Sequence, residues 1–147
     1  MPFCLRLPRR LYEAMLEQAL AECPNECCGL LAGRFHDEPS GARIGLVVER
    51  YPLVNALASP VEFESEPRSM FEAEREMRRR GLEILAVYHS HPTSAAVPSH
   101  KDRARNYSPD IVNLIISFAG PQPMMRGWWL TAESQQEAAW ECFDETP

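Results

Sequence analysis

Two histidines, a serine and an aspartate within one short segment are the residues of this chain best suited to chemistry. His89 and His91 end an apolar run and are followed by Pro92, so on a strand both imidazoles point to the same face, near the strand's end. Ser99 and Asp102 follow in the spacing H-x-H-x7-S-x2-D. Two imidazoles on one face can share a cation such as zinc.

Each half of this pattern has an ordinary structural explanation when it is taken alone. A single His-x-His is more often a hydrogen-bonded polar pair than a pair of ligands, and Ser-x-x-Asp is a common cap at the start of a helix. The combination is far rarer, since shuffling this composition should produce the full spacing in roughly one chain in five thousand. A cap would also help to hold Ser99 and Asp102 in place. The pattern therefore predicts a metal site.

A hydrolytic site also needs a base. Two neutral imidazoles and one carboxylate leave a tetrahedral zinc ion one open position for water, which is typical of catalytic sites. A carboxylate outside the ligand set must then take the proton of that water. Glu26 is the candidate, because it opens an apolar, glycine-containing strand where a charge needs a reason. From the residues alone, solvation at the strand end explains it equally well.

Other metal chemistries fit these residues less well. Two histidines and a carboxylate are also the ligand set of non-haem iron oxygenases, but those enzymes have no use for the Glu26 and Ser99 pair that hydrolysis requires. Cys23, Cys27 and Cys28 could bind a metal, yet they lack the paired spacing of structural zinc sites. A zinc deaminase is excluded, because the Pro-Cys-x-x-Cys motif of those enzymes does not occur.

The periodicity of apolar residues and the positions of prolines predict the surrounding elements. The tail over residues 135–143 fits either a helix or a strand. We expect helices over residues 8–23 and 67–80, a short helix from residue 99, and strands over residues 27–35, 44–55, 83–91, 111–118 and 124–130. Together they indicate one mixed α/β domain over residues 1–147.

Composition and charge limit the possible partners. With 147 residues, of which 45% are hydrophobic and 24% charged, the chain can form one globular core. A net charge of −6 argues against nucleic acid, whose binding relies on basic groups. The apolar runs are too short to span a bilayer, and the first residues do not resemble a secretory signal. The five scattered cysteines then indicate reduced thiols in a cytoplasmic protein.

Glu26 ahead of CGLLAG, followed by HSHPTSAAVPSHKD, resembles the motif of the JAMM metallopeptidases, also called the MPN-plus or JAB family. The likeness is complete at every position of the motif. Weaker likeness extends through Asn55, GLEILAVYHSHP and IVNLIISF, and so covers most of the chain. The resemblance implies a mixed sheet flanked by helices, in a JAMM/MPN-like, cytidine-deaminase-like domain of the compact prokaryotic type.

The resemblance also implies a role for each residue of the motif. One zinc ion would be held by His89, His91 and Asp102. Glu26 would polarise a water molecule, and Ser99 would hydrogen-bond the oxyanion of the tetrahedral intermediate. The implied reaction is therefore zinc-dependent hydrolysis of an amide or isopeptide bond.

The implied substrates are the C-terminal tails of ubiquitin-like proteins, including sulfur carriers. The regions in which larger family members carry insertions that grip ubiquitin chains are short here, so a linkage-specific deubiquitinase is not expected. The alternative within the family is a catalytically silent scaffold, since related domains that lost their ligands serve as assembly modules. A monomer or a homodimer is expected, and the sequence does not name the substrate.

Overall fold

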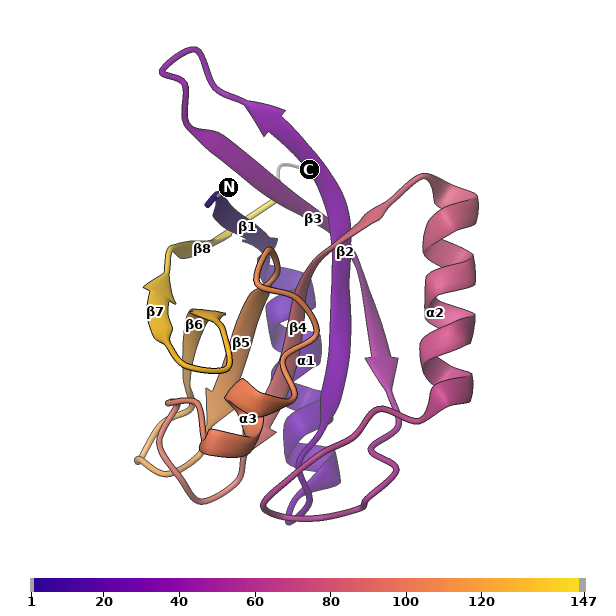
Figure 1. The fold of residues 1–147 in the computed structure, drawn as a ribbon, viewed down its shortest axis with the longest axis vertical. Coiled ribbons are helices and arrows are strands. Elements are labelled where there is room, and N and C mark those ends of the chain that lie inside the picture. The colour runs from indigo at the N-terminus through magenta and orange to yellow at the C-terminus, as the bar shows by residue number, and fades with distance from the viewer. Residues whose placement is uncertain (1, 146–147) are drawn as a thin grey trace.

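The computed structural model describes residues 2–145 as a mixed eight-stranded sheet with helices on both of its faces (Figure 1). This agrees with the expected α/β architecture. The strands are β1 (Cys4–Pro8), β2 (Cys28–Asp37), β3 (Arg43–Leu53), β4 (Glu83–His91), β5 (Val112–Ser117), β6 (Met124–Leu130), β7 (Gln135–Ala138) and β8 (Trp140–Phe143). The helices are α1 (Arg9–Glu22), α2 (Pro67–Arg80) and α3 (His100–Ala104).

The order of the strands in the sheet is β7-β6-β5-β4-β2-β3-β1-β8. Strands β4 and β5 run parallel, so their carboxyl ends lie side by side. Strand β2 is antiparallel to β4, with Cys28 opposite His89. The start of β2 therefore lies beside the end of β4, and residues far apart in the sequence meet at this edge.

The two faces of the sheet are covered by different helices. Helix α1 packs its Leu11, Met15 and Ala19 into one core cluster, which includes Leu31 and Tyr88 of the sheet. On the opposite face, α2 covers a second cluster of apolar residues, namely Cys28, Leu30, Ala32, Leu53, Ala73, Met77 and Leu82. Because successive side chains of a strand point to opposite faces, Cys28 and His89 belong to the side of α2.

The two long helices begin and end where their sequences predict. Helix α2 has Pro67 in its first turn, and the Glu66 side chain accepts a hydrogen bond from the Ser69 N–H at 3.1 Å. It ends at Gly81, whose φ of 66° lies in the left-handed region that glycine adopts without strain. No helix within residues 2–145 is long and apolar enough to cross a bilayer.

The ends of the chain depart from the sequence-based expectations. Cys4–Pro8 forms β1, which was not expected, and the ambiguous residues 135–143 form the two short strands β7 and β8. Strand β1 lies between β3 and β8 and is parallel to both. These strands are short, and their partners are distant in the sequence, so local periodicity carries little information about them.

Candidate metal centre

Three of the residues expected to bind metal converge at the carboxyl end of β4. The Nε2 atoms of His89 and His91 are 3.1 Å apart. Oδ2 of Asp102, on α3, lies 3.3 Å from Nε2 of His89 and 3.2 Å from Nε2 of His91. His89 and His91 are buried and Asp102 is partly buried. The structure thus brings together three ligand atoms that could hold one metal ion.

The chemistry of these atoms also suits a cation. Nδ1 of His91 lies 2.8 Å from the Ala95 carbonyl oxygen, and a carbonyl only accepts, so Nδ1 carries a proton. In the neutral form of the ring, which is the form that binds metal, Nε2 then directs a lone pair towards Asp102. Although burial opposes ionisation, contacts with His89 and His91 hold the pKa of Asp102 well below its usual range. Lone pairs therefore face one another at this point, and a metal ion placed between them would satisfy all three.

His89 is held on the face of its ring by Phe63, from the segment between β3 and α2. The two rings are stacked, with centroids 4.5 Å apart and an interplanar angle of 27°. Burial lowers the pKa of His89, although Asp102 opposes this effect, so the imidazole is held in the neutral form that binds metal. The described residues offer no hydrogen-bond partner to its buried Nδ1.

Glu26 lies just before β2, and continuation of the β2–β4 register places it on the same face of the sheet as His91. Its side chain is buried, with 4% of the residue exposed, and its Oε1 finds no hydrogen-bond partner among the described residues. Burial raises the pKa of Glu26 to about 7, although the charge of His91 opposes the shift. The alternative explanation, in which Glu26 is merely a solvated residue at the end of a strand, is therefore wrong.

Two polar residues that sequence reasoning did not place in the site fix the backbone on either side of Glu26. The Asn55 amide donates to the Glu26 carbonyl at 3.0 Å, and the Glu26 N–H donates to the Ser59 carbonyl at 2.8 Å. The Ser90 hydroxyl accepts from the Cys27 N–H at 2.8 Å. In the sequence, only the position of Ser90 between two histidines of an apolar strand points to such a role. Asn55 stands out only through the likeness to the family.

Ser99 and Asp102 form the capping box that their spacing predicts. Oγ of Ser99 accepts from the Asp102 N–H at 3.0 Å, and Oδ2 of Asp102 accepts from the Ser99 N–H at 2.9 Å. The same carboxylate oxygen thus caps α3 and faces the two histidines. Ser99 is exposed, and its cap uses an oxygen lone pair, so the hydroxyl proton remains available to a ligand.

A cavity of about 180 Å³ opens beside the three ligand atoms. His89 and Asp102 line one part of it, and the remaining wall is largely apolar. Its apolar lining comes from β2, β3, β4, α2 and the segment before α2: Leu30, Leu53, Phe63, Met70 and Val87. Glu62 forms an ion pair with Lys101 at 2.8 Å, which ties the segment before α2 to α3 across this cavity.

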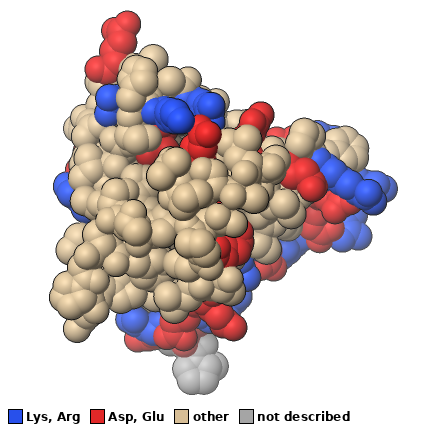
Figure 2. Space-filling model, turned by 90° about the horizontal axis from the view of Figure 1, so that it is seen from below, with Lys and Arg blue, Asp and Glu red and all other residues tan. Residues whose placement is uncertain are grey.

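The end of the molecule around the site carries few charges. Figure 2 looks onto this end, and most of the charged side chains lie at its margins. The segments at this end, residues 55–61, 92–98 and 119–125, contain no Asp, Glu, Lys or Arg. The last of them includes the start of β6, and the others are loops. Several large apolar side chains of these segments are exposed, namely Leu57, Val61, Val97 and Met124.

The cysteines considered as metal ligands are not part of this group, which among the described residues consists of the two histidines and Asp102. Cys27 and Cys28 are buried free thiols, and burial raises the pKa of Cys28 to about 12, which disfavours metal binding as a thiolate. Of the two adjacent tryptophans, Trp128 is buried, and Trp129 packs against the core on the other face.

Comparison with known proteins supports the family resemblance seen in the sequence. The chain is 38% identical over 100 residues to a probable TtuB-protein conjugate cleaving protease of Thermus thermophilus, a match that covers 67% of this chain and 60% of that protein. It is 37% identical over 105 residues to the desampylase of Haloferax volcanii, covering 71% of this chain and 70% of that protein. The first match thus spans less than two thirds of its relative.

Among solved structures, protein DSY2949 from Desulfitobacterium hafniense has a similar fold. The TM-score is 0.82 at 33% identity, and the match covers 96% of this chain and 94% of that one. The family model of prokaryotic homologues of the JAB domain matches residues 8–131, which include every residue of the motif. The chain therefore belongs to the family of prokaryotic JAB-domain homologues, as the resemblance in its sequence predicts.

Proposed function

We propose that this chain is a zinc-dependent peptidase that hydrolyses the amide or isopeptide bond at the C-terminus of a ubiquitin-like or sulfur-carrier protein. One observation carries the proposal: the unpaired, buried carboxylate of Glu26 lies on the sheet face on which His89, His91 and Asp102 converge. Three ligands and a separate carboxylate are what metal-assisted hydrolysis requires.

His89, His91 and Asp102 are the proposed ligands of one zinc ion. When bound there, zinc supplies Lewis acidity, which acidifies a water molecule and polarises a substrate carbonyl. The protein contributes the orientation of the ligands, through Ala95 for His91 and Phe63 for His89. These contacts lie within the protein, so they orient both imidazoles independently of a metal ion.

Glu26 is the proposed general base and acid. A pKa of about 7 matches a group that must gain and lose a proton near neutral pH. Its carboxylate would take the proton of the attacking water and pass it to the leaving amine. The hydrogen bonds from Asn55 and to Ser59 fix the backbone of Glu26, so the carboxylate need not be reoriented during this transfer.

Ser99 is the proposed donor to the carbonyl oxygen of the substrate. Its position at the start of α3 is fixed by the capping box, and its proton is not used by the cap. A prepositioned hydroxyl beside a developing oxyanion accelerates acyl transfer because charge appears there only in the transition state.

The surroundings of the site support a protein as the substrate. Uncharged loops with exposed apolar side chains suit a protein surface, whereas the phosphates of a nucleic acid would need basic groups. The relatives' names support a protein conjugate in particular. With its free cysteines, the protein is proposed to act in the cytoplasm, as a monomer or a homodimer and without a membrane partner.

The decisive experiment offers ubiquitin-like proteins with extended C-termini to the zinc-loaded protein and reads the products by mass spectrometry. We expect cleavage directly after the ubiquitin-like domain's own C-terminal residue, and loss of that cleavage in a chelator and in Glu26→Gln. Uncleaved substrates with a normally folded, zinc-loaded protein would favour the silent scaffold. Iron rather than zinc in protein purified aerobically without added metal would favour an oxygenase.

A further inference from the structure

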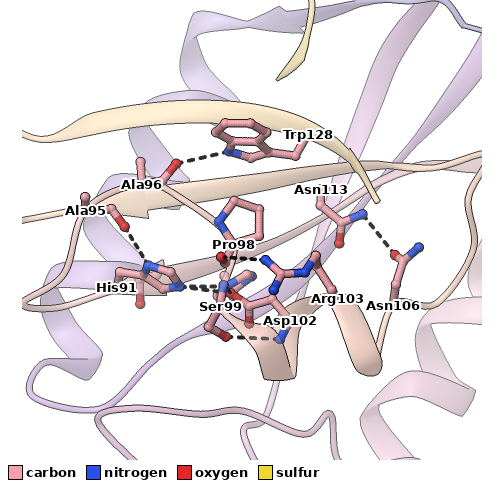
Figure 3. A network of polar contacts seen from close by, with 12 residues as sticks. His91, Ala95, Ala96, Pro98, Ser99, Asp102, Arg103, Asn106, Asn113 and Trp128 are labelled. Carbon is pink, nitrogen blue, oxygen red and sulfur yellow. Dashed lines mark hydrogen bonds and ion pairs between the residues drawn. The ribbon is translucent and has the colours of Figure 1, made fainter. Parts of the chain in front are cut away.

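Three consecutive backbone carbonyls in the loop between β4 and α3 are each bound by a side chain from a different strand. Figure 3 shows two of these contacts, His91 with Ala95 and Trp128 with Ala96. The loop, residues 92–98, joins the last metal-site histidine to Ser99. The pairs are the Ser117 hydroxyl with the Ser94 carbonyl at 2.6 Å, His91 Nδ1 with the Ala95 carbonyl at 2.8 Å, and Trp128 Nε1 with the Ala96 carbonyl at 3.0 Å.

The two outer bonds restrict where the middle carbonyl points, together with the Val97 N–H, which also donates to that carbonyl at 2.8 Å. Ala95 lies between Ser94 and Ala96, and the peptide units on both sides of it are held from β5 and β6. Its carbonyl is therefore directed at Nδ1 of His91, whose ring is turned so that Nε2 faces Asp102. The loop acts on the ring orientation of His91 without touching Asp102.

The indole of Trp128 both packs in the core and donates a hydrogen bond. It is 6% exposed and packs with Ala96, Ile115 and Leu130 in a small core cluster of its own. A leucine or phenylalanine would satisfy packing alone, but only an N–H reaches the buried carbonyl of Ala96. The N–H of Trp128 thus binds the loop whose Ala95 carbonyl contacts His91.

We propose that Trp128 is a positioning residue of the metal centre, whose indole N–H, together with the Ser117 hydroxyl, holds residues 92–98 so that Ala95 orients His91 for metal binding. The inference rests on the proposed function only in so far as His91 is a ligand. It requires neither the identity of the substrate nor catalysis, so zinc affinity tests it without an activity assay.

The test compares Trp128→Phe with Trp129→Phe. Both remove an indole from the same strand, but Trp129 lies on the other face, where its ring packs edge-on against Phe3 at 5.1 Å. Zinc affinity is measured by competition with a chelator, and backbone amide exchange of residues 93–97 is followed by mass spectrometry. We expect Trp128→Phe to weaken zinc binding about tenfold or more, as loss of an outer support of a ligand does, and to speed exchange in the loop.

Trp129→Phe should leave both zinc affinity and loop exchange unchanged. Equal zinc affinity of Trp128→Phe and wild type would overturn the proposal and reduce Trp128 to a filler of the core. Should Trp128→Phe fail to fold, Ser117→Ala removes the other outer bond, and the same weakening is expected from it. A wild-type protein that binds no zinc would instead refute the metal centre itself, which separates the two failures.

Discussion

The Ser90 hydroxyl accepts a hydrogen bond from the Cys27 N–H at 2.8 Å, and this contact joins the strand of the two histidines to the segment that carries Glu26. The Ser90 N–H in turn donates to the Cys27 carbonyl at 3.2 Å. Ser90 is fully buried and points away from the face on which the histidines lie. Ser90 thus fixes the spacing between the proposed base and the proposed metal ligands from the opposite face of the sheet.

Ser90→Ala tests this role. The substitution leaves the buried Cys27 N–H without its partner, which should lower the free energy of unfolding by about 1–3 kcal/mol. Denaturant unfolding measures that change, and Ser40→Ala, at an exposed turn where the hydroxyl makes only a 3.4 Å contact, is the matched control. Equal stability of the two variants would show that Ser90 does not join the two segments.

Removal of a ligand should abolish metal binding. His89→Ala and Asp102→Asn each remove one of three protein ligands, so zinc content measured after dialysis should fall from about one equivalent to near zero. His100→Ala is the control, because His100 is exposed and is not among the three side chains that converge; it should keep its zinc. Stoichiometric zinc in purified His89→Ala would make the proposed ligand set wrong.

Ser99 can be separated into its two roles by two variants. Ser99→Ala removes both the cap and the hydroxyl donor, so α3 should lose about 1 kcal/mol of stability and turnover should fall about a hundredfold. Ser99→Gly also lacks the donor, but glycine costs only a few tenths of a kcal/mol at this position of a helix. Turnover should therefore be equally low in both variants, while their thermal stabilities differ. Wild-type turnover in Ser99→Gly would leave Ser99 a helix cap alone.

The sequence was sufficient to predict the residues that meet at the metal centre. His89, His91 and Asp102 lie close together along the chain, and a strand end followed by a capped helix brings them together by local geometry. The prediction that Glu26 belongs to the site rested on the resemblance to a family. Its approach to the two histidines depends on the pairing of β2 with β4, and nothing in the local sequence PNECCGLL specifies that pairing.

The supports of the site could not be predicted for the same physical reason. Ser90, Asn55 and Trp128 act through backbone groups of distant segments, and a hydrogen bond to a carbonyl leaves no pattern in the sequence. Strand β1 was not expected, and β8 lies in a segment that fits either a helix or a strand, because β1 is stabilised by pairing with β3 and β8, and β8 by pairing with β1, rather than by their own few residues.

Glu26→Gln should separate catalysis from metal binding. The amide keeps the size of the side chain and removes its basicity, so the variant should retain zinc while cleavage falls by a factor of about a hundred or more. Mass spectrometry of the cleaved substrate and metal analysis of the same preparation give the two readouts. Loss of zinc would make Glu26 a ligand, and normal cleavage would assign the base to another residue.

The stability of the metal-free protein gives an independent test of the burial of Glu26. Its pKa of about 7 in the folded state lies above the ordinary pKa of 4.5 for a glutamate, so the folded state holds a proton that the unfolded chain releases between these two values. The free energy of unfolding should therefore fall as pH rises from about 4.5 to about 7, by up to ~3 kcal/mol at 1.36 kcal/mol per pKa unit. Glutamine does not ionise, so in a chelator Glu26→Gln should be more stable than wild type at pH 8, and this advantage should shrink towards pH 4.5. A difference between the two proteins that did not change with pH would show that the carboxylate of Glu26 is not desolvated, and would remove the physical basis for its role as a base near neutral pH.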